Sequence, residues 1–136
     1  MRYSRHLLMD DIGEQGQERL LNAHVLIVGM GGLGCPVSLY LAAAGIGRIS
    51  ICDGDRVDQS NLQRQVLYTP EDCGKPKVEC ARQRLLALNP DTDITAYAEK
   101  LSPQVLASGY DLVVDCTDNL AARQQLNAHC YQRKLP

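Results

Sequence analysis

The chain has 136 residues, 45% of them hydrophobic, which is enough for one domain with a buried core. Its formal net charge is −2, and no run of Lys or Arg gathers the basic residues in one place, which argues against a nucleic-acid-binding surface. No apolar segment has membrane-spanning length, and the N-terminus turns acidic before the apolar core of a signal peptide forms. We therefore expect a soluble, cytoplasmic protein that binds neither nucleic acid nor a membrane.

The first half of the chain predicts helices and strands in alternation. A helix with sparse apolar positions is expected over residues 11–23. The strand expected over 25–28 consists of β-branched residues and leucine, which suit burial on both faces. A second helix is expected over 33–44, with Gly45 as its end, and a second strand over 48–52.

The second half continues the alternation. A helix over residues 76–88 begins with a proline and carries one apolar face, formed by Val78, Ala81, Leu85 and Leu88. The remaining expected elements are a strand over 93–98, a short helix over 103–107, a strand over 110–115 and a helix over 119–133. Alternating helices and strands of this kind predict an α/β fold with a parallel sheet.

A strand, a glycine-rich loop, a helix and a second strand that ends in an acid are typical of a Rossmann-like doubly wound fold. Because its crossovers are right-handed, the carboxyl ends of the strands meet at one edge of the mainly parallel sheet. We expect that edge to collect residues 29–34, 53–64 and 116–119 in one crevice that binds a ligand. The chain ends where a fifth strand is expected, so residues 1–136 are interpreted as one nucleotide-binding domain that is an incomplete portion of a larger sheet.

The sequence VLIVGMGGLG places the spacing GxGxxG at Gly29, Gly31 and Gly34, with Gly32 as a further glycine. Glycines let the backbone approach a phosphate, and the following helix offers free N–H groups to an anion. The pattern alone does not tell a dinucleotide from a nucleoside triphosphate. Asp53 ends the second strand, where a carboxylate is placed to accept hydrogen bonds from ribose hydroxyls; its alternative role is to form the turn in the DGD sequence.

Two cations and a third loop favour a triphosphate. The pyrophosphate of a dinucleotide carries about two negative charges, whereas a triphosphate carries about four and calls for cations. Arg64 and Lys77 are the candidate cations, and their alternative role is that of solvated surface charges. Asp118 follows the last strand, where its carboxylate suits Mg²⁺. Capping of the following helix is the alternative for Asp118, and residue chemistry leaves both open.

The six cysteines contain no CxxC pair; they are Cys35, Cys52, Cys73, Cys80, Cys116 and Cys130. Their spacing fits neither a zinc ribbon nor a small secreted disulfide scaffold, and it favours reduced thiols. Cys35, Cys52 and Cys116 are interpreted as buried packing residues rather than as nucleophiles.

Several motifs occur in the order that characterises a known family. They are GMGGLG from Gly29, the acid at Asp53, SNLQRQ over residues 60–65, GKPKVE around Lys77, and DCTDN over residues 115–119, with RYSRH at the start and LNP at 88–90. The chain thereby resembles the ubiquitin-activating-enzyme superfamily, and within it the bacterial sulfur-carrier adenylyltransferases of the ThiF, MoeB and HesA type. The resemblance runs through essentially the whole chain.

The resemblance implies ATP and Mg²⁺ as cofactors and the C-terminal Gly-Gly carboxylate of a ubiquitin-like sulfur carrier as the group that is adenylated. The implied carrier is ThiS, of thiamine synthesis, and the alternative is MoaD, of molybdopterin synthesis. The implied nucleotide-binding positions are Gly29, Gly31, Gly32, Gly34, Asp53, Asp55, Ser60, Asn61, Arg64, Lys77, Asp118 and Asn119. The implied catalytic residues are Arg64, Lys77, Asp118 as the magnesium-organising carboxylate, and Arg5, which in homodimers of the family reaches the ATP of the partner subunit.

The chain departs from the family in one respect. Family members commonly continue beyond the position of Pro136 with a crossover loop and two CxxC pairs that bind structural zinc, and the chain holds no such zinc ligands. A catalytically inactive nucleotide-binding or dimerisation fragment is therefore an alternative. An NAD-binding oxidoreductase is disfavoured because it leaves Arg64, Lys77 and Asp118 without a role. A dehydratase of modified tRNA from the same superfamily is disfavoured because NLQRQ resembles the sulfur-carrier enzymes more closely.

Overall fold

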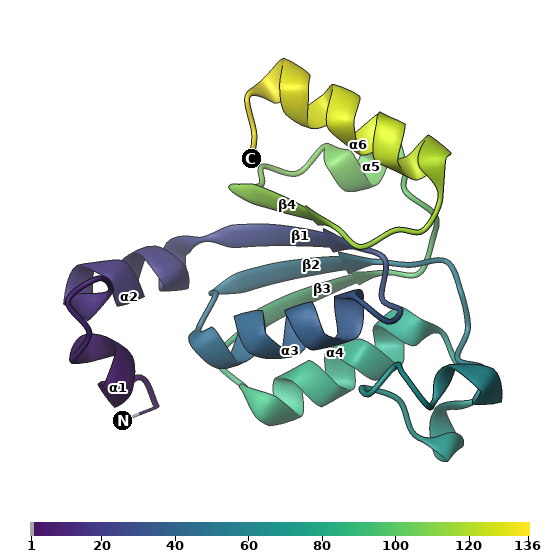
Figure 1. Cartoon of the computed structure of the whole chain (residues 1–136), viewed down its shortest axis with the longest axis horizontal. Helices are drawn as coiled ribbons and strands as arrows, with labels where there is room; N and C mark the ends of the chain where they lie inside the picture. Colours follow the sequence, from purple (N-terminus) through teal and green to yellow (C-terminus); the bar gives the residue numbers. More distant parts are fainter. Residues whose placement is uncertain (1) are drawn as a thin grey trace.

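A computed structural model describes residues 2–136 and has a four-stranded sheet at its centre (Figure 1). The strands are β1 His24–Val28, β2 Arg48–Cys52, β3 Asp93–Tyr97 and β4 Leu112–Asp115. Their order across the sheet is β3-β2-β1-β4, and each neighbouring pair is parallel. The carboxyl ends of the strands therefore lie at one edge of the sheet, as the sequence predicts.

Helices cover both faces of this sheet. They are α1 Ser4–Leu7, α2 Gly13–Asn22, α3 Gly34–Ala44, α4 Lys77–Leu88, α5 Pro103–Leu106 and α6 Leu120–Arg133, with short 3-10 turns η1 Gln59–Asn61 and η2 Pro70–Asp72. In Figure 1, α3 and α4 lie on one face, α5 and α6 lie on the other, and α1 and α2 lie beyond the amino ends of the strands. The predicted doubly wound α/β fold is confirmed.

Strand β1 is buried along its whole length because it lies between two hydrophobic cores. Val25 and Ile27 belong to the core beneath α3 and α4, whereas Leu26 and Val28 belong to the core beneath α5 and α6. This alternation is the two-residue period of a strand, and it explains why β1 reads as a continuous apolar run. Each fully buried Leu or Ile contributes about 1.5–3 kcal/mol of stability.

The structure differs from the prediction at a few positions. Helix α1 was not predicted. The residue before it, Tyr3, is held by a contact distant in sequence, since its hydroxyl accepts a hydrogen bond from Asn89 Nδ2 at 2.7 Å. Strand β4 begins two residues later than predicted, because Tyr110 is buried in the core beneath α5 and α6 and donates its hydroxyl hydrogen to Val105 O. Leu88 is partly exposed at the end of α4, so the predicted apolar face stops at Leu85.

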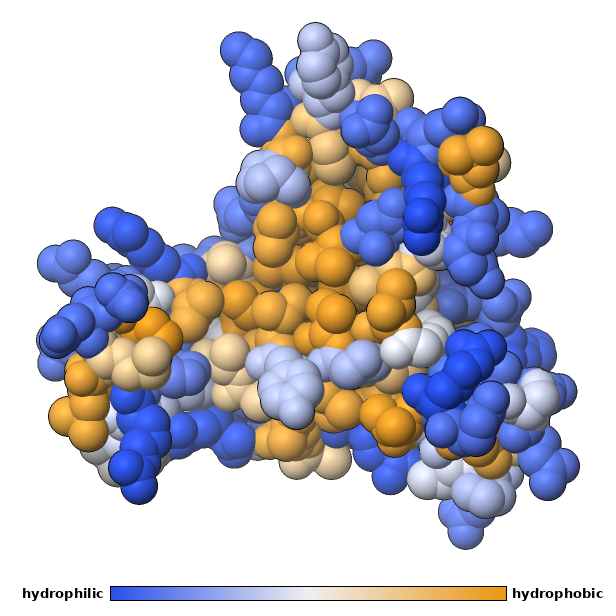
Figure 2. Space-filling model, in the orientation of Figure 1, coloured by the Kyte–Doolittle hydropathy of each residue, from blue (hydrophilic) through white to orange (hydrophobic). Residues whose placement is uncertain are grey.

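The α3 side of β4 is less covered than the rest of the sheet. Leu112 and Val114 pair with Val25 and Ile27, which places them on the face of the sheet that α3 covers at β1. Leu112 is nonetheless exposed, as is Tyr40 of α3. Figure 2 shows apolar side chains gathered across the middle of the molecule on this side. No helix within residues 2–136 is long and apolar enough to cross a membrane.

Candidate functional site

A cavity of ≈ 1050 Å³ lies at the carboxyl ends of the strands. Its lining includes Lys77 at the start of α4 and these residues from the three predicted loops: Gly29, Gly31, Gly32, Asp53, Asp55, Asn61, Arg64, Asp118 and Asn119. The structure therefore brings ten of the predicted nucleotide-binding positions to one cavity. Gly34 and Ser60, which were also predicted, do not line it.

Two glycines set the shape of the loop after β1. Gly29 has a φ of +96°, and a β-carbon there would lie 2.5 Å from the carbonyl oxygen of Cys116 in the loop after β4. A β-carbon at Gly34 would lie 1.9 Å from the carbonyl oxygen of Gly29. Only glycine permits these approaches, so Gly29 packs the loop against its neighbour and Gly34 packs α3 against β1. Gly34 thus shapes the site without lining it.

The other two glycines face side chains from the β2–α4 connection. A β-carbon at Gly32 would lie 3.1 Å from Arg64 Nη1, and one at Gly31 would lie 3.4 Å from Gln65 Nε2. We call Gly31, Gly32, Arg64 and Gln65 together the glycine wall. The wall combines open backbone with a guanidinium and an amide, which are donor groups suited to phosphate oxygens.

The carboxylate of Asp53 is held by two backbone donors. Its Oδ2 accepts a hydrogen bond from Met30 N at 2.8 Å, and its Oδ1 accepts one from Asp55 N at 2.8 Å. Asp53 therefore forms the turn that the sequence offered as an alternative and also ties that turn to the glycine loop. A carboxylate has about four lone-pair sites, so two remain for ribose hydroxyls.

The predicted cations differ in their surroundings. Lys77 is the first residue of α4, its side chain is only 8% exposed, and its Nζ lies 4.0 Å from Asp55 Oδ2. Arg64 is exposed at the cavity and forms no ion pair with any of residues 2–136. Lys77 has one carboxylate at 4.0 Å and Arg64 has none, so both leave positive charge available for an anionic ligand.

Asn61 and Ser60 have separate tasks in η1. Asn61 Oδ1 accepts a hydrogen bond from Asp58 N at 3.0 Å, which orients the amide and leaves Nδ2 free for a ligand in the cavity. Ser60 donates its hydroxyl hydrogen to Asp58 Oδ1 at 2.6 Å. Ser60 N also donates to Asp58 Oδ1, at 2.8 Å, and these two hydrogen bonds from Ser60 lower the pKa of Asp58. Ser60 therefore stabilises the turn rather than contacting the cavity.

The loop after β4 shows which residue caps α6. Asn119 is the N-cap of α6, where its Oδ1 accepts a hydrogen bond from Ala122 N at 2.8 Å. The capping role for Asp118 is therefore wrong. Asp118 is exposed at the cavity and has no side-chain partner in the described part of the chain.

The donor chemistry of Asp118 fits Mg²⁺. Residues 2–136 contain no group of three His, Cys, Asp or Glu side chains that could hold a metal by themselves. Mg²⁺ usually binds one or two carboxylates together with waters and phosphate oxygens. One free carboxylate beside a phosphate-binding wall meets that need, and the magnesium role of Asp118 stays a prediction.

An arginine that the sequence did not indicate stabilises the Asp118 loop. Arg123 donates to Thr117 O from Nε at 3.3 Å and from Nη2 at 2.8 Å, and its Nε lies 3.9 Å from Asp115 Oδ2. Asp115 Oδ1 also accepts hydrogen bonds from Thr117 N at 2.9 Å and Thr117 Oγ1 at 2.6 Å. We call Asp115, Thr117 and Arg123 the loop brace. The sequence feature that could have indicated it is the position of Arg123, one helical turn after Asn119.

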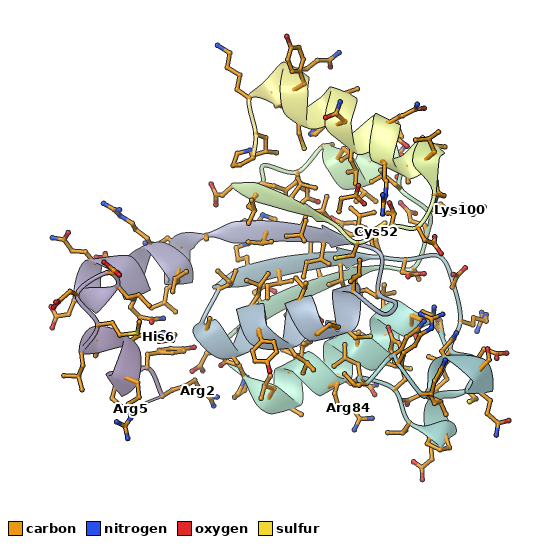
Figure 3. The ribbon with its side chains drawn as sticks, viewed as in Figure 1. Arg2, Arg5, His6, Cys52, Arg84 and Lys100 are labelled. Atoms are coloured by element: carbon orange, nitrogen blue, oxygen red, sulfur yellow. The ribbon has the colours of Figure 1, made fainter. Side chains whose placement is uncertain are left out.

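Further lining residues also lay outside the prediction. They include Val28, Cys52, Gln65, Glu99, Lys100, Leu101, Ala121, Ala122, Arg123 and Gln125. Residues 99–101 follow β3, so the rule that places ligands at the carboxyl ends of strands could have found them. Figure 3 shows Lys100 and Cys52 toward the carboxyl ends of the strands and Arg5 at the far end of the molecule. Arg5 therefore lies outside the cavity of its own chain, and its reach into a partner subunit stays a prediction.

The thiols of Cys52 and Cys116, which line the cavity, and of Cys35 at the start of α3 are unsuited to nucleophilic attack. Burial, with the carboxylates of Asp53 and Glu99, raises the pKa of Cys52 to about 12. Burial also raises the pKa of Cys35 and of Cys116. These cysteines remain protonated thiols. Cys35 and Cys52 are buried, which confirms that they serve in packing, whereas Cys116 packs against the core but is only partly buried, which corrects its predicted burial.

Comparison with known sequences shows a consistent group of relatives. The family model described as the ThiF family matches residues 3–136. The sulfur carrier protein ThiS adenylyltransferase of Escherichia coli is 50% identical, with an alignment that covers 100% of this chain and 55% of that protein. The molybdopterin-synthase adenylyltransferase of Salmonella typhimurium is 46% identical, with coverages of 100% and 56%. The chain spans about half the length of the curated relatives that it matches.

Two solved structures share the fold of this chain and are 29% and 33% identical to it in sequence. The tRNA threonylcarbamoyladenosine dehydratase TcdA of E. coli has a TM-score of 0.91 and 29% identity, covering 99% of this chain and 57% of that one. E. coli MccB, solved with ATP, has a TM-score of 0.87 and 33% identity, covering 100% of this chain and 43% of that one. With a family match over nearly the whole chain, these findings show that the chain belongs to the ThiF family.

Proposed function

We propose that this chain is the nucleotide-binding part of an enzyme that uses MgATP to adenylate the C-terminal Gly-Gly carboxylate of a ubiquitin-like sulfur carrier. The observation that carries the proposal is the convergence of the glycine wall, Lys77 and Asp118 on one cavity. The wall and Lys77 match a chain of phosphates, and the free carboxylate matches its magnesium. The two adenylyltransferase relatives and the ATP complex of MccB support this assignment.

A nicotinamide dinucleotide fits the same cavity less well. Asp53 would serve the ribose of either ligand. Arg64, Lys77 and Asp118 add two cations and a metal-binding carboxylate, which a pyrophosphate held by a glycine loop does not require. The cavity chemistry therefore favours ATP over NAD.

The chemistry follows from positioning and charge. An oxygen of the carrier's terminal carboxylate forms a bond to the α-phosphorus, and the bond from that phosphorus to the bridging oxygen breaks, which releases pyrophosphate and leaves an acyl-adenylate. The carboxylate is already ionised, so no strong base is needed. Arg64 and Lys77 would offset charge on the phosphates, and Asn61 would donate from Nδ2. Magnesium held by Asp118 would neutralise the charge of the pyrophosphate.

We further propose ThiS as the carrier, with MoaD as the second candidate. Identity to the ThiS adenylyltransferase of E. coli exceeds that to the molybdopterin-synthase adenylyltransferase by only four percentage points, from 50% to 46%. A sulfur carrier as partner is the conclusion that both relatives support. The choice between carriers is left to the experiment.

The proposal includes a cytoplasmic homodimer in which Arg5 serves the partner subunit's ATP. Two observations support it. Arg5 is exposed on α1, far from the cavity of its own chain (Figure 3). The face of β4 and α3 that carries Leu112 and Tyr40 is apolar and exposed, as surfaces that associate commonly are.

ATP–pyrophosphate exchange with purified ThiS-type and MoaD-type carriers tests the function. We expect exchange that requires a carrier, and a loss of at least about 100-fold in Asp118→Ala, because an interaction with developing charge is removed. Asp91→Ala removes an exposed carboxylate at the opposite end of the molecule and serves as the matched control. Nucleotide binding without carrier-dependent exchange would support the inactive-fragment alternative. Exchange that survives Asp118→Ala would refute the magnesium role.

A further inference from the structure

The side chain of Gln65 lies in the cavity lining and is only 2% exposed. Its Oε1 is the single buried side-chain nitrogen or oxygen within residues 2–136 that has no hydrogen-bond partner. Nε2 is not among the fully buried atoms without a partner, and it takes part in none of the side-chain hydrogen bonds within residues 2–136. Buried polar groups are nearly always paired, so an unpaired amide at a cavity calls for an explanation.

The backbone around Gln65 is held firmly, so a loose loop does not explain the unpaired amide. Gln65 N donates to Asn61 O at 2.9 Å, and Tyr68 N donates to Gln65 O at 3.2 Å. Tyr68 in turn donates its hydroxyl hydrogen to Met30 O at 2.6 Å, which ties this connection to the glycine loop. The amide of Gln65 is thus presented to the cavity from a fixed turn.

The amide nitrogen of Gln65 faces the glycine loop. Nε2 is the atom nearest to the β-carbon position of Gly31, at 3.4 Å, just as Arg64 Nη1 is nearest to that of Gly32, at 3.1 Å. Two consecutive donors therefore lie opposite two consecutive glycines. Glycine at position 31 keeps the space above Nε2 open for a ligand atom.

We propose that Gln65 binds the nucleotide directly, with Nε2 donating to a phosphate oxygen that lies over Gly31, beside the charge of Arg64. This inference rests on the proposed function for the presence of ATP. In the free protein the buried Oε1 without a partner lowers stability. A bound phosphate gives Nε2 an acceptor, whereas Oε1, itself an acceptor, stays unpaired. Residues that conflict with local stability are expected at binding sites.

Gln65→Met tests the proposal because methionine has a similar length and shape but lacks the amide. We expect the Kd for MgATP, measured by calorimetry, to rise about 10- to 100-fold, as for a lost hydrogen bond to a charged group. The melting temperature without nucleotide is expected to stay the same or to rise by about 2–6 °C, because an unpaired polar group leaves the interior. Opposite directions for ligand affinity and stability are the signature of the proposed role.

Gln65→Glu separates donation by Nε2 from acceptance by Oε1. Glutamate keeps an acceptor oxygen but replaces the donor with an anion that repels phosphate, so ATP binding should be weaker than in Gln65→Met. Gln83→Met is the matched control, since Gln83 is exposed on α4 and methionine has a similar helix propensity. The control should keep the wild-type Kd and melting temperature.

Wild-type ATP affinity in Gln65→Met or in Gln65→Glu would overturn the proposal. A melting temperature of Gln65→Met that falls together with its ATP affinity would also overturn it, because Gln65 would then only stabilise the loop. A wild-type chain that binds ATP but lacks carrier-dependent exchange refutes the proposed function and leaves this inference standing. A wild-type chain that does not bind ATP refutes both.

Discussion

At the scale of single residues, Gly34 has the tightest packing of the glycines around the cavity. A β-carbon there would lie 1.9 Å from Gly29 O, and the contact is with backbone rather than with a movable side chain. We therefore expect Gly34→Ala to lower the free energy of unfolding by about 1–3 kcal/mol, the usual effect of overpacking. Urea denaturation measures this change.

Gly109→Ala is the control for that substitution, because a β-carbon at Gly109 meets no atom within 4 Å. Its effect on the free energy of unfolding should stay within about 0.5 kcal/mol. Equal effects of the two substitutions would contradict the role of Gly34 in packing α3 against β1.

Residues of the same motif also differ in what their side chains contact. Asp53 was assigned either to a ribose or to a turn, and its two carboxylate oxygens accept from Met30 N and Asp55 N while it still lines the cavity. Ser60 belongs to the motif, yet its hydroxyl bonds to Asp58 and not to the cavity. A motif identifies which residues occur together, whereas the hydrogen-bond partner of each depends on distances of a few tenths of an ångström.

At the scale of elements, the loop brace joins β4 to α6 and sets the position of Asp118. Arg123→Ala removes two hydrogen bonds to Thr117 O from a partly exposed side chain. We expect the free energy of unfolding to change by no more than about 1 kcal/mol, because exposed charged contacts contribute little to global stability. Magnesium-dependent ATP binding should weaken about tenfold, since the loop carrying Asp118 loses its restraint.

Calorimetric ATP titrations with and without magnesium test this role of the brace. Only the gain in affinity that magnesium provides should shrink in Arg123→Ala, and Arg123→Lys should restore part of that gain. Arg133→Ala, at the exposed end of the same helix, is the control. An equal loss of affinity in the absence of magnesium would show that Arg123 acts on the nucleotide itself.

At the scale of the whole molecule, the cavity lies at one edge of the sheet and a buried histidine lies near the other. His24 at the start of β1 donates from Nδ1 to Gly109 O at 3.1 Å, so its Nε2 accepts from the hydroxyl of Ser50 at 2.8 Å. Burial, with the nearby charge of Arg48, lowers the pKa of His24 below its ordinary value of 6.5. The neutral ring is therefore part of the folded state.

This shift predicts a loss of stability in acid. Below about pH 6.5 the unfolded chain binds a proton at this position that the folded chain resists, so the free energy of unfolding falls as the pH falls. The contribution is complete above the unfolded pKa, and the loss levels off once the pH drops below the folded pKa. Urea denaturation between about pH 7.5 and about pH 5.5 measures the slope.

His24→Gln should flatten that slope, because glutamine stays neutral throughout the range. His129→Gln is the matched control, since His129 on α6 makes none of the contacts of His24. An unchanged slope in His24→Gln would assign the acid effect to other groups.

The sequence by itself determined the architecture, because periodicity and glycine spacing act locally. The apolar run of β1 and the Gly45 end of α3 each depend on neighbours within a few positions. Parallel strands then bring their carboxyl ends to one edge whatever their side chains, so the loops that carry Gly29, Asp53 and Asp118 could be predicted to meet.

Only the tertiary structure decided which side chains at that edge are free. Asn119 rather than Asp118 caps α6, Arg123 bonds to Thr117 O, and Gln65 is buried without a partner beside Gly31. The first two outcomes depend on the exact backbone geometry of the loop after β4, and the third depends on burial, none of which residue type and spacing fix. Packing decides which polar groups have a hydrogen-bond partner within the protein, and the groups without one are available to a ligand.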